Sequence, residues 1–185
     1  YPLTAANLKI QEDKSYNRMI DFTVSPFNDA GPCLYHFTIG GYNPNKLRRY
    51  QDIIENGLNK DIAKLNQGRF DAMHYFNMLN CKYIKTAPEA EKLITNPYAL
   101  GPCWFVNRLK IVNTPEEEIT LVDSLNPKDI AIIHKEFEAD ISDMMLGADT
   151  SNNESRYIRF ISYDPKYMVY ESNSSKDEFA VFSEV

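Results

Sequence analysis

Residues 36–50 constrain the fold more than any other stretch, because a glycine turn leads there into a helix start. The pair Gly40-Gly41 permits positive φ angles that a residue with a Cβ resists. Asn43-Pro44 is typical of an N-cap with proline at the first helical position, so the pattern predicts a helix over residues 44–56. The apolar side of this helix consists of Leu47, Tyr50, Ile53 and Ile54, and Gly57 is its expected stop.

The first two turns of this expected helix carry charge of the sign that a helix start disfavours. Lys46, Arg48 and Arg49 lie there, and each misplaced cation costs roughly 0.3–1 kcal/mol beside the exposed N–H groups. One interpretation is an internal ion-pair network with some of the 26 acidic side chains. The other is an anion or polar-ligand site that these cations form with the backbone turn, His36 and Tyr42.

The length of 185 residues and the apolar content of 43% predict a single domain over residues 1–185. A net charge of −6 argues against nucleic acid as a partner, since that binding needs a cationic surface. No apolar run approaches the roughly 18–20 residues of a bilayer span, and no signal-peptide pattern is present. The chain begins at Tyr1 without a methionine and stops within a strand pattern, so we expect a domain excised from a larger protein.

The three cysteines, Cys33, Cys81 and Cys103, match no metal-binding spacing, and the three histidines are scattered. We therefore expect no metal and no cofactor. The cysteines are either three small buried apolar residues or include one disulfide. Cys33 and Cys103 each follow a Gly-Pro pair, so a bridge between them is conceivable in an oxidising compartment.

Local patterns predict an α+β fold in which helices pack with a small mixed sheet over the first two thirds of the chain. Thr114-Pro115 followed by three glutamates marks a helix start, because a cap, a proline and acids lie where a helix favours them. The expected strands cover 20–24, 83–84 and 104–112, and the other expected helices cover 58–66, 69–79 and 114–122.

The last third is typical of β structure. An apolar run over 130–133 precedes a polar loop over 138–154, after which an antiparallel β-meander is expected. Its strands cover 156–163, 166–172 and 178–183. They contain Tyr157, Tyr163, Tyr167 and Tyr170, which either stack on sugar rings or are half-buried strand residues.

The sequence has no nucleophile elbow, P-loop, dinucleotide-binding or zinc-protease motif, so no residue is predicted to be catalytic. Carboxylate pairs drawn from Asp21, Asp29, Asp52 and Glu55 are expected by chance in so acidic a chain. His74 is interpreted as a core histidine. Trp104, the single tryptophan, either packs in the core or provides a platform for a ligand.

Several runs of residues resemble the soluble segment of YfhO-type bacterial membrane proteins, and the resemblance covers most of the chain. The most specific run is the string from His36 to Tyr50, which continues to Asp52. Cysteine at 33 and 103 departs from the small or hydroxylated residues expected there, which favours the bridge. The other matching runs are 25–30, 77–84, 96–106 and 183–185.

The resemblance implies the extracytoplasmic, or periplasmic, region of a multi-spanning protein similar to C-type membrane glycosyltransferases. Their catalytic acids lie near the first membrane spans, so this chain is expected to be a non-catalytic accessory domain that acts with cell-envelope glycans. Its expected partners are the transmembrane part of the same polypeptide and an envelope glycan or polyprenyl-phosphate sugar. His36, Tyr42, Lys46, Arg48, Arg49 and Trp104 are the candidate docking or ligand residues.

Two other functions remain open. A carbohydrate-binding or assembly module without a transferase role would present a row of exposed aromatic rings on one sheet face. A self-standing enzyme would hold two carboxylates in an open pocket at a hydrolytic separation. If internal carboxylates saturate all three cations of the 36–50 segment, the ligand interpretation of that segment is wrong.

Overall fold

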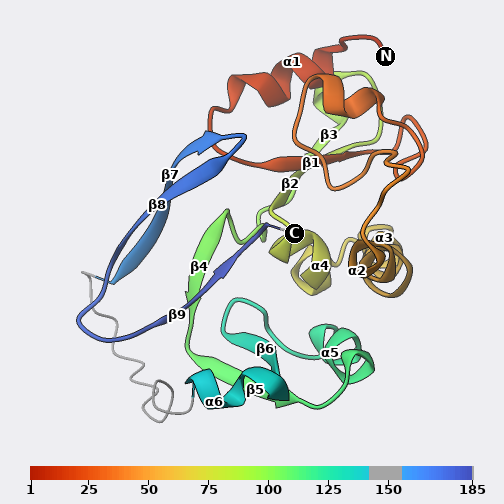
Figure 1. Ribbon diagram of the computed structural model, residues 1–185. Coiled ribbons are helices and arrows are strands. Elements are labelled where there is room, and N and C mark those ends of the chain that lie inside the picture. The colour runs from red at the N-terminus through yellow and green to blue at the C-terminus, as the bar shows by residue number, and fades with distance from the viewer. Residues whose placement is uncertain (142–155, 185) are drawn as a thin grey trace. The chain divides into compact units, whose positions relative to one another are not determined.

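The computed structural model describes residues 1–141 and 156–184, which form two compact units (Figure 1). Unit 1 contains residues 1–101 and unit 2 contains residues 102–184. Each unit mixes helices and strands, which confirms the predicted α+β class. The prediction of one domain over residues 1–185 stays a prediction.

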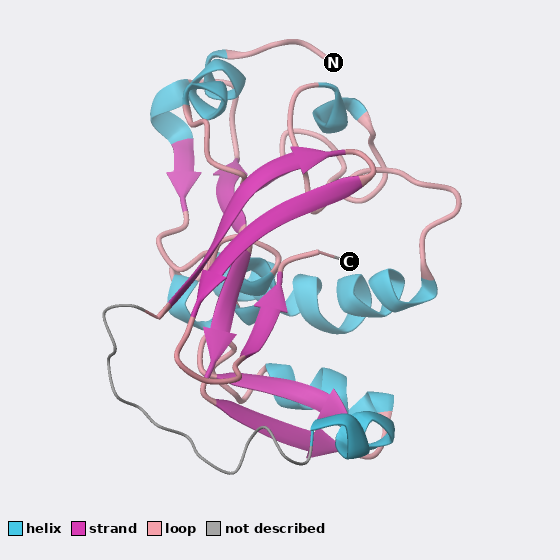
Figure 2. Ribbon diagram, turned by 60° about the vertical axis from the view of Figure 1, so that its left-hand side comes forward, coloured by secondary structure: helices cyan, strands magenta, loops and turns pink. Residues whose placement is uncertain are grey.

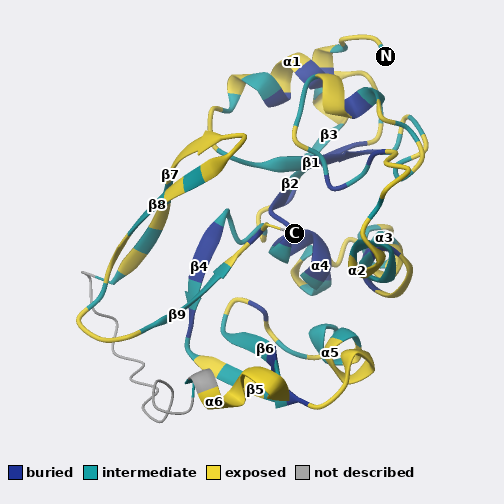
Figure 3. Cartoon of the chain, viewed as in Figure 1, coloured by how far each residue is buried: buried dark blue, intermediate teal, exposed yellow. Residues whose placement is uncertain are grey.

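Unit 1 is built on a three-stranded mixed sheet in the order β1-β2-β3. β1 (Arg18–Asp21) pairs in parallel with β2 (Cys81–Lys85), which pairs antiparallel with β3 (Leu93–Thr95). The core against this sheet holds Met19, Ile20, Ile39, Met73, Phe76 and Ile84, each at most 1% exposed. The short strands predicted around 20 and 83 are therefore the buried centre of the unit (Figure 3).

Helices and single turns make up the rest of unit 1, and α4 (His74–Met78) packs against β2. α1 (Ala5–Glu12) begins at a capping box of Thr4 and Asn7, and the 3-10 turn η1 (Gly31–Leu34) follows β1. The remaining elements are α2 (Arg48–Ile53), the π-helical turn η2 (Ile54–Leu58), α3 (Asn59–Leu65), the 3-10 turn η3 (Phe70–Ala72), α4 (His74–Met78) and the 3-10 turn η4 (Ala90–Lys92). The helix predicted over 69–79 is thus interrupted at Met73.

The helix predicted over 44–56 starts later than its sequence pattern indicates. Its N-cap is Leu47, and the Asn43 side chain closes a turn by accepting from the backbone N–H of Asn45 at 2.9 Å. An asparagine side chain that bonds two residues ahead stabilises a turn in place of a cap. Lys46 therefore lies in the loop before α2, and only the two arginines lie in the first helical turn.

Gly57 was expected to stop this helix, and that prediction is wrong. The helical path runs from α2 through η2 into α3 without a break. A Cβ built at Gly57 would lie 2.6 Å from the Tyr75 ring, so glycine is needed there for close packing. Local sequence cannot distinguish a glycine that ends a helix from one that lets an aromatic ring approach it.

The described residues of unit 2 form three two-stranded sheets. Their strands are drawn in magenta in Figure 2. β5 (Arg108–Val112) pairs in parallel with β6 (Ile130–His134). The connection between these strands contains α5 (Pro115–Val122), whose N-cap is Thr114. β7 (Tyr157–Asp164) and β8 (Tyr167–Asn173) form an antiparallel hairpin with a bulge after Phe160. The third pair is β4 (Cys103–Val106) with β9 (Phe179–Phe182), also antiparallel.

Three details of unit 2 differ from the sequence prediction. The strand expected over 104–112 is divided at Asn107 into β4 and β5, which belong to different sheets. β9 pairs with β4, while β7 and β8 pair with each other. The loop expected over 138–154 begins as helix α6 (Glu138–Ile141) after the 3-10 turn η5 (Lys135–Phe137), and its residues 142–154 lie outside the described part.

Candidate functional site

Residues 42–49, named here the 42–49 loop, form an exposed cationic segment of unit 1. Tyr42 is 58% exposed and Leu47 is 63% exposed, both high values for such large apolar side chains. The loop is held at its base, because the Gly41 N–H donates to the Pro26 carbonyl at 2.7 Å and the Tyr50 hydroxyl donates to the Ile39 carbonyl at 2.5 Å. The two ends of the 42–49 loop are thus held by hydrogen bonds, and the residues between them present aromatic, aliphatic and cationic side chains at the surface.

The three cations of this loop differ in their partners. The Arg48 Nε lies 3.1 Å from the Asp52 Oδ1, but its side chain stays 89% exposed, so the pair is a surface ion pair of small energy. Among the described residues, the Lys46 Nζ reaches only the Phe27 carbonyl, at 3.4 Å. Arg49 is exposed and has no ion pair within residues 1–141 and 156–184. Carboxylates of the described residues therefore do not pair with all three cations. The finding that would have made the ligand interpretation of this segment wrong is not observed.

Two of the predicted site residues do not join the 42–49 loop. His36 is half-buried and bonds to Asn7 of α1, with its Nε2 2.9 Å from the Asn7 Nδ2. Trp104 is buried in unit 2, where its Nε1 donates to the Pro127 carbonyl at 2.9 Å. The structure thus brings together Tyr42, Lys46, Arg48 and Arg49, and places the other two in core surroundings.

His36 instead belongs to a buried polar cluster that sequence reasoning missed, named here the Lys85 network. It consists of Tyr1, Asn7, Asp21, His36 and Lys85, and its innermost members Asn7, Asp21 and Lys85 are at most 1% exposed. The Lys85 Nζ lies 3.0 Å from the Asp21 Oδ2, 2.9 Å from the Tyr1 hydroxyl and 3.2 Å from the Asn7 Oδ1. The Tyr1 hydroxyl donates in turn to Asp21.

The network joins elements that are far apart in the sequence. Asp21 ends β1 and Lys85 ends β2, and the two residues are direct partners in the parallel pairing of these strands. Asn7 comes from the first turn of α1. The only local signal for the network is a charged residue that directly follows an apolar strand, at Asp21 and again at Lys85, which by itself is a weak signal.

The electrostatics of the network explain why its charges can stay buried. Burial raises the pKa of Asp21, but hydrogen bonds from Thr23, Tyr1 and Lys85 outweigh it and lower the pKa below its ordinary value. Burial lowers the pKa of Lys85, and its bonds to Tyr1 and Asp21 raise the pKa above the ordinary value. Both groups are therefore charged in the folded state at neutral pH.

Hydrogen-bond donors fix the form of His36. The Asn7 Oδ1 faces the Lys85 ammonium and, at 3.2 Å, the Thr4 backbone N–H, neither of which can accept a bond. This leaves the Asn7 amide nitrogen to donate to the His36 Nε2, which must then carry no proton. Neutral His36 with its proton on Nδ1 is thus built into the network.

The stability of the protein is expected to fall as His36 takes up a proton. Burial lowers the pKa of His36, and the Lys85 charge lowers it further against an opposing effect of Asp21. In the unfolded chain, His36 has a pKa of about 6.5. It therefore binds a proton at a pH at which His36 of the folded state is still neutral. The contribution of His36 to the free energy of unfolding should therefore be constant above the pKa of the unfolded state. It should decrease as the pH falls from there towards the lower pKa of His36 in the folded state.

Urea unfolding of the wild type and of His36→Gln at several pH values between neutral and mildly acidic measures this effect. The decrease that remains in His36→Gln comes from other groups, and the difference between the two slopes is the His36 contribution. Equal slopes for the wild type and His36→Gln would contradict the assigned neutral form.

The Lys85 network has the chemistry of a structural element. Clusters of titratable groups with shifted pKa values are candidates for active sites, and this cluster qualifies on that criterion. However, its charged members bind one another and are at most 1% exposed, so no substrate can touch them in this conformation. The described residues provide no group of His, Cys, Asp and Glu that could hold a metal ion.

The three cysteines are free thiols in the structure, and Cys33 is exposed, so the interpretation of three buried cysteines is wrong for that residue. Burial raises the pKa of Cys103 to about 11, so it is a thiol and not a thiolate at neutral pH. Cys33 belongs to unit 1 and Cys103 to unit 2. The bridge between them stays a prediction.

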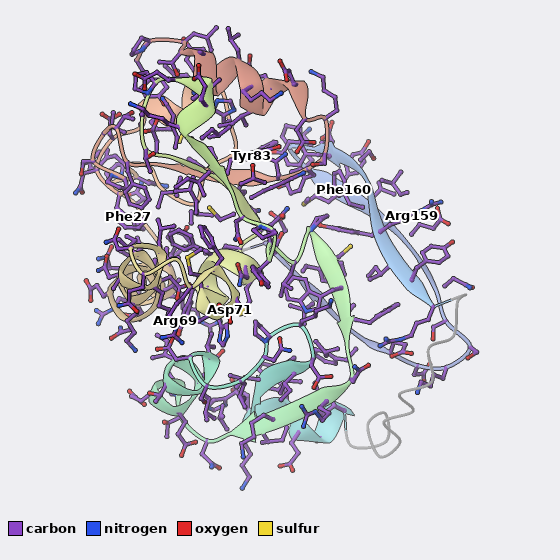
Figure 4. All side chains as sticks on the ribbon, turned by 180° about the vertical axis from the view of Figure 1, so that it is seen from behind. Phe27, Arg69, Asp71, Tyr83, Arg159 and Phe160 are labelled. Carbon is purple, nitrogen blue, oxygen red and sulfur yellow. The ribbon has the colours of Figure 1, made fainter. Side chains whose placement is uncertain are left out.

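The tyrosines of the β7–β8 hairpin do not form a row on one face. The register places Tyr157 and Tyr167 on one face and Tyr163 on the other, and Figure 4 shows the neighbours Arg159 and Phe160 projecting to opposite sides. Tyr170 is half-buried against Phe182, with ring centroids 4.7 Å apart. The arrangement that a tyrosine-based sugar platform would need is therefore incomplete.

Comparison of the chain with known proteins finds no matching family model, no matching curated protein and no matching solved structure. The resemblance of the His36 to Tyr50 string to YfhO-type proteins stays a prediction. Within the described residues, no helix is long and apolar enough to cross a bilayer.

Proposed function

We propose that this chain is a non-catalytic extracytoplasmic accessory domain of a membrane-embedded, glycosyltransferase-like protein of YfhO type that acts on cell-envelope glycans. In this proposal the 42–49 loop is its docking or ligand surface. The observation that carries the proposal is the exposed, incompletely paired cationic segment, in which Arg49 has no ionic partner among the described residues. The sequence resemblance is strongest over the same segment.

The use of charge in unit 1 supports this assignment. The buried ionic groups Asp21 and Lys85 bind each other, so they are occupied in holding the fold. Arg48 and Arg49 instead lie at the surface at the start of α2. An exposed guanidinium can bind phosphate through two parallel hydrogen bonds, which suits a polyprenyl-phosphate sugar or an acidic envelope glycan.

Two roles are compatible with this surface. It either contacts the sugar or lipid phosphate, or it docks the domain onto the transmembrane part of the same polypeptide. The first role predicts that the purified chain binds a ligand by itself, and the second predicts that it does not. One titration therefore separates them.

We expect the chain to bind farnesyl phosphate, a short soluble polyprenyl phosphate, or members of a panel of cell-envelope glycan fragments, as measured by calorimetric titration. The triple variant Lys46→Ala, Arg48→Ala, Arg49→Ala should weaken this binding by at least about 1,000-fold, since hydrogen bonds to charged groups contribute about 1.5–3 kcal/mol each. Circular dichroism and the urea midpoint must show that the variant is folded.

The matched control replaces three exposed lysines of the same unit, Lys9, Lys14 and Lys92, which removes equal charge elsewhere. If the control variant loses as much affinity as the triple variant, the loss is an effect of net charge. That result would contradict a binding site at the 42–49 loop. Absence of all binding leaves the docking role. Glycan binding that survives the triple change would favour the carbohydrate-binding module in place of the proposal.

A further inference from the structure

The loop before α2 contains large apolar side chains as well as cations. Tyr42 and Leu47 are mostly exposed, and Leu34 on the neighbouring turn η1 is 68% exposed. Such side chains are normally scattered singly on a protein surface. Here they are adjacent to positive charge, because Leu47 lies between Lys46 and Arg48 in the chain.

Contacts bring the two loops together. A Cβ built at Gly41 would lie 3.1 Å from the Cys33 sulfur, so the residues before Leu34 and before Tyr42 touch. On the other side, Lys46 bonds to the carbonyl of Phe27, which Figure 4 places on the loop next to α2. Leu34 and the 42–49 loop therefore lie on neighbouring segments, and together they are named here the Leu34–Arg49 patch, which comprises Leu34, Tyr42, Lys46, Leu47, Arg48 and Arg49.

The charge of this patch is opposite to that of the whole chain. The protein carries a net charge of −6, yet residues 30–51 contain no aspartate or glutamate and three cations. Asp52, at the C-terminal boundary of that stretch, pairs with Arg48 without covering it. The patch thus concentrates three cations in an otherwise acidic protein, and an anionic partner would complement it.

We infer that the Leu34–Arg49 patch binds the surface of an anionic lipid bilayer. Cations beside exposed Leu and Tyr side chains fit an interface in which a phosphate layer and an apolar layer lie a few Å apart. The guanidinium and ammonium groups contact lipid phosphates, while Tyr42, Leu47 and Leu34 enter the boundary between headgroups and acyl chains. An acidic protein partner would satisfy the cations but provides no comparable reason for the exposed aliphatic side chains between them.

The inference rests on the proposed function in one respect, since both assign the 42–49 loop as the recognition surface. It goes further because it names the lipid surface itself as the partner. It requires no glycan and no polyprenyl phosphate, so plain vesicles test it. The two proposals can therefore fail independently.

The test is sedimentation of the chain with phosphatidylcholine vesicles and with vesicles that also contain phosphatidylglycerol. We expect binding only to the anionic vesicles, and a loss with rising salt. The triple variant Lys46→Ala, Arg48→Ala, Arg49→Ala should lose on the order of 100-fold in affinity, from about 1 kcal/mol per cation near an anionic surface. The double variant Tyr42→Ser, Leu47→Ser keeps all charges and should lose on the order of 10-fold, because insertion of its apolar side chains is removed.

The Lys9, Lys14 and Lys92 triple variant is the control and should bind like the wild type. Equal binding by the wild type and the Lys46, Arg48, Arg49 variant, or no vesicle binding, would overturn the inference. No vesicle binding together with retained farnesyl phosphate or glycan binding overturns it while the proposed function stands. Vesicle binding without those soluble ligands supports the inference and removes the ligand role from the proposed function. Binding of polyglutamate through the same cations, without vesicle binding, would identify an acidic protein partner instead.

Discussion

Replacement of Lys85 by methionine is expected to lower the free energy of unfolding by about 3–5 kcal/mol, because it leaves Asp21 charged and buried without its cation. Lys85 is 1% exposed and Asp21 is fully buried, with 3.0 Å between the Lys85 Nζ and the Asp21 Oδ2. The change also removes one donor from the Tyr1 hydroxyl and one from Asn7. Urea unfolding at neutral pH measures the loss.

Lys82→Met is the matched control on the same strand. Lys82 pairs with Asp13 at 2.6 Å, but its side chain is 35% exposed, so water replaces much of the lost interaction. Its expected cost is about 1 kcal/mol or less. If the two variants cost the same, the burial of the Lys85 pair has no special energetic role.

The double variant Asp21→Asn, Lys85→Met identifies the cause of the loss. It removes the orphaned charge and should be more stable than Lys85→Met alone. The deficit of Lys85→Met should also shrink in acid. An unpaired buried carboxylate has a raised folded pKa, so it is destabilising above that value and is relieved as the pH falls through it. A deficit that grows in acid would contradict this account.

Gly40→Ala is the second change with a large expected effect, about 3 kcal/mol of lost stability. A Cβ at Gly40 would lie 2.1 Å from the Pro26 carbonyl oxygen, which is backbone and cannot rotate away. The same carbonyl accepts from the Gly41 N–H at 2.7 Å, so the two loops would have to separate and break that bond. The neighbouring Ile39, 1% exposed, would be displaced from the core.

Gly68→Ala controls for the loss of a glycine as such. Gly68 has a positive φ of 70° but nothing within 4 Å of its added Cβ. Its cost is limited to backbone strain of about 1–2 kcal/mol. Urea unfolding should therefore rank Gly40→Ala as the more destabilised variant, and the reverse order would refute the close approach at Pro26.

The Gly40-Gly41 pair illustrates what sequence reasoning can and cannot reach. The pattern indicated that the pair permits a positive φ, and Gly41 has one, at +101°. Gly40 cannot carry a Cβ for a different reason, because a carbonyl from fourteen residues earlier in the chain approaches it closely. Only the folded chain brings that carbonyl to it.

The candidate site divides in the same way. The exposure of Tyr42, Arg48 and Arg49 follows from a local run of polar and charged residues, so the sequence could point to the 42–49 loop. The position of His36 could not be predicted, because its partner Asn7 lies in a helix twenty-nine residues away. The Lys85 network was missed for the same reason, since its central pair forms only when β1 and β2 align.

By itself, the sequence determined the α+β class and the capped helix after Thr114, because these depend on caps and alternation within a few residues. Tertiary structure alone decided that β9 joins β4, that the helix runs on through Gly57, and that Asp21 meets Lys85. The physical reason is that each of these outcomes depends on a partner distant in sequence. Its contact energy outweighs the local preference that the residues express on their own.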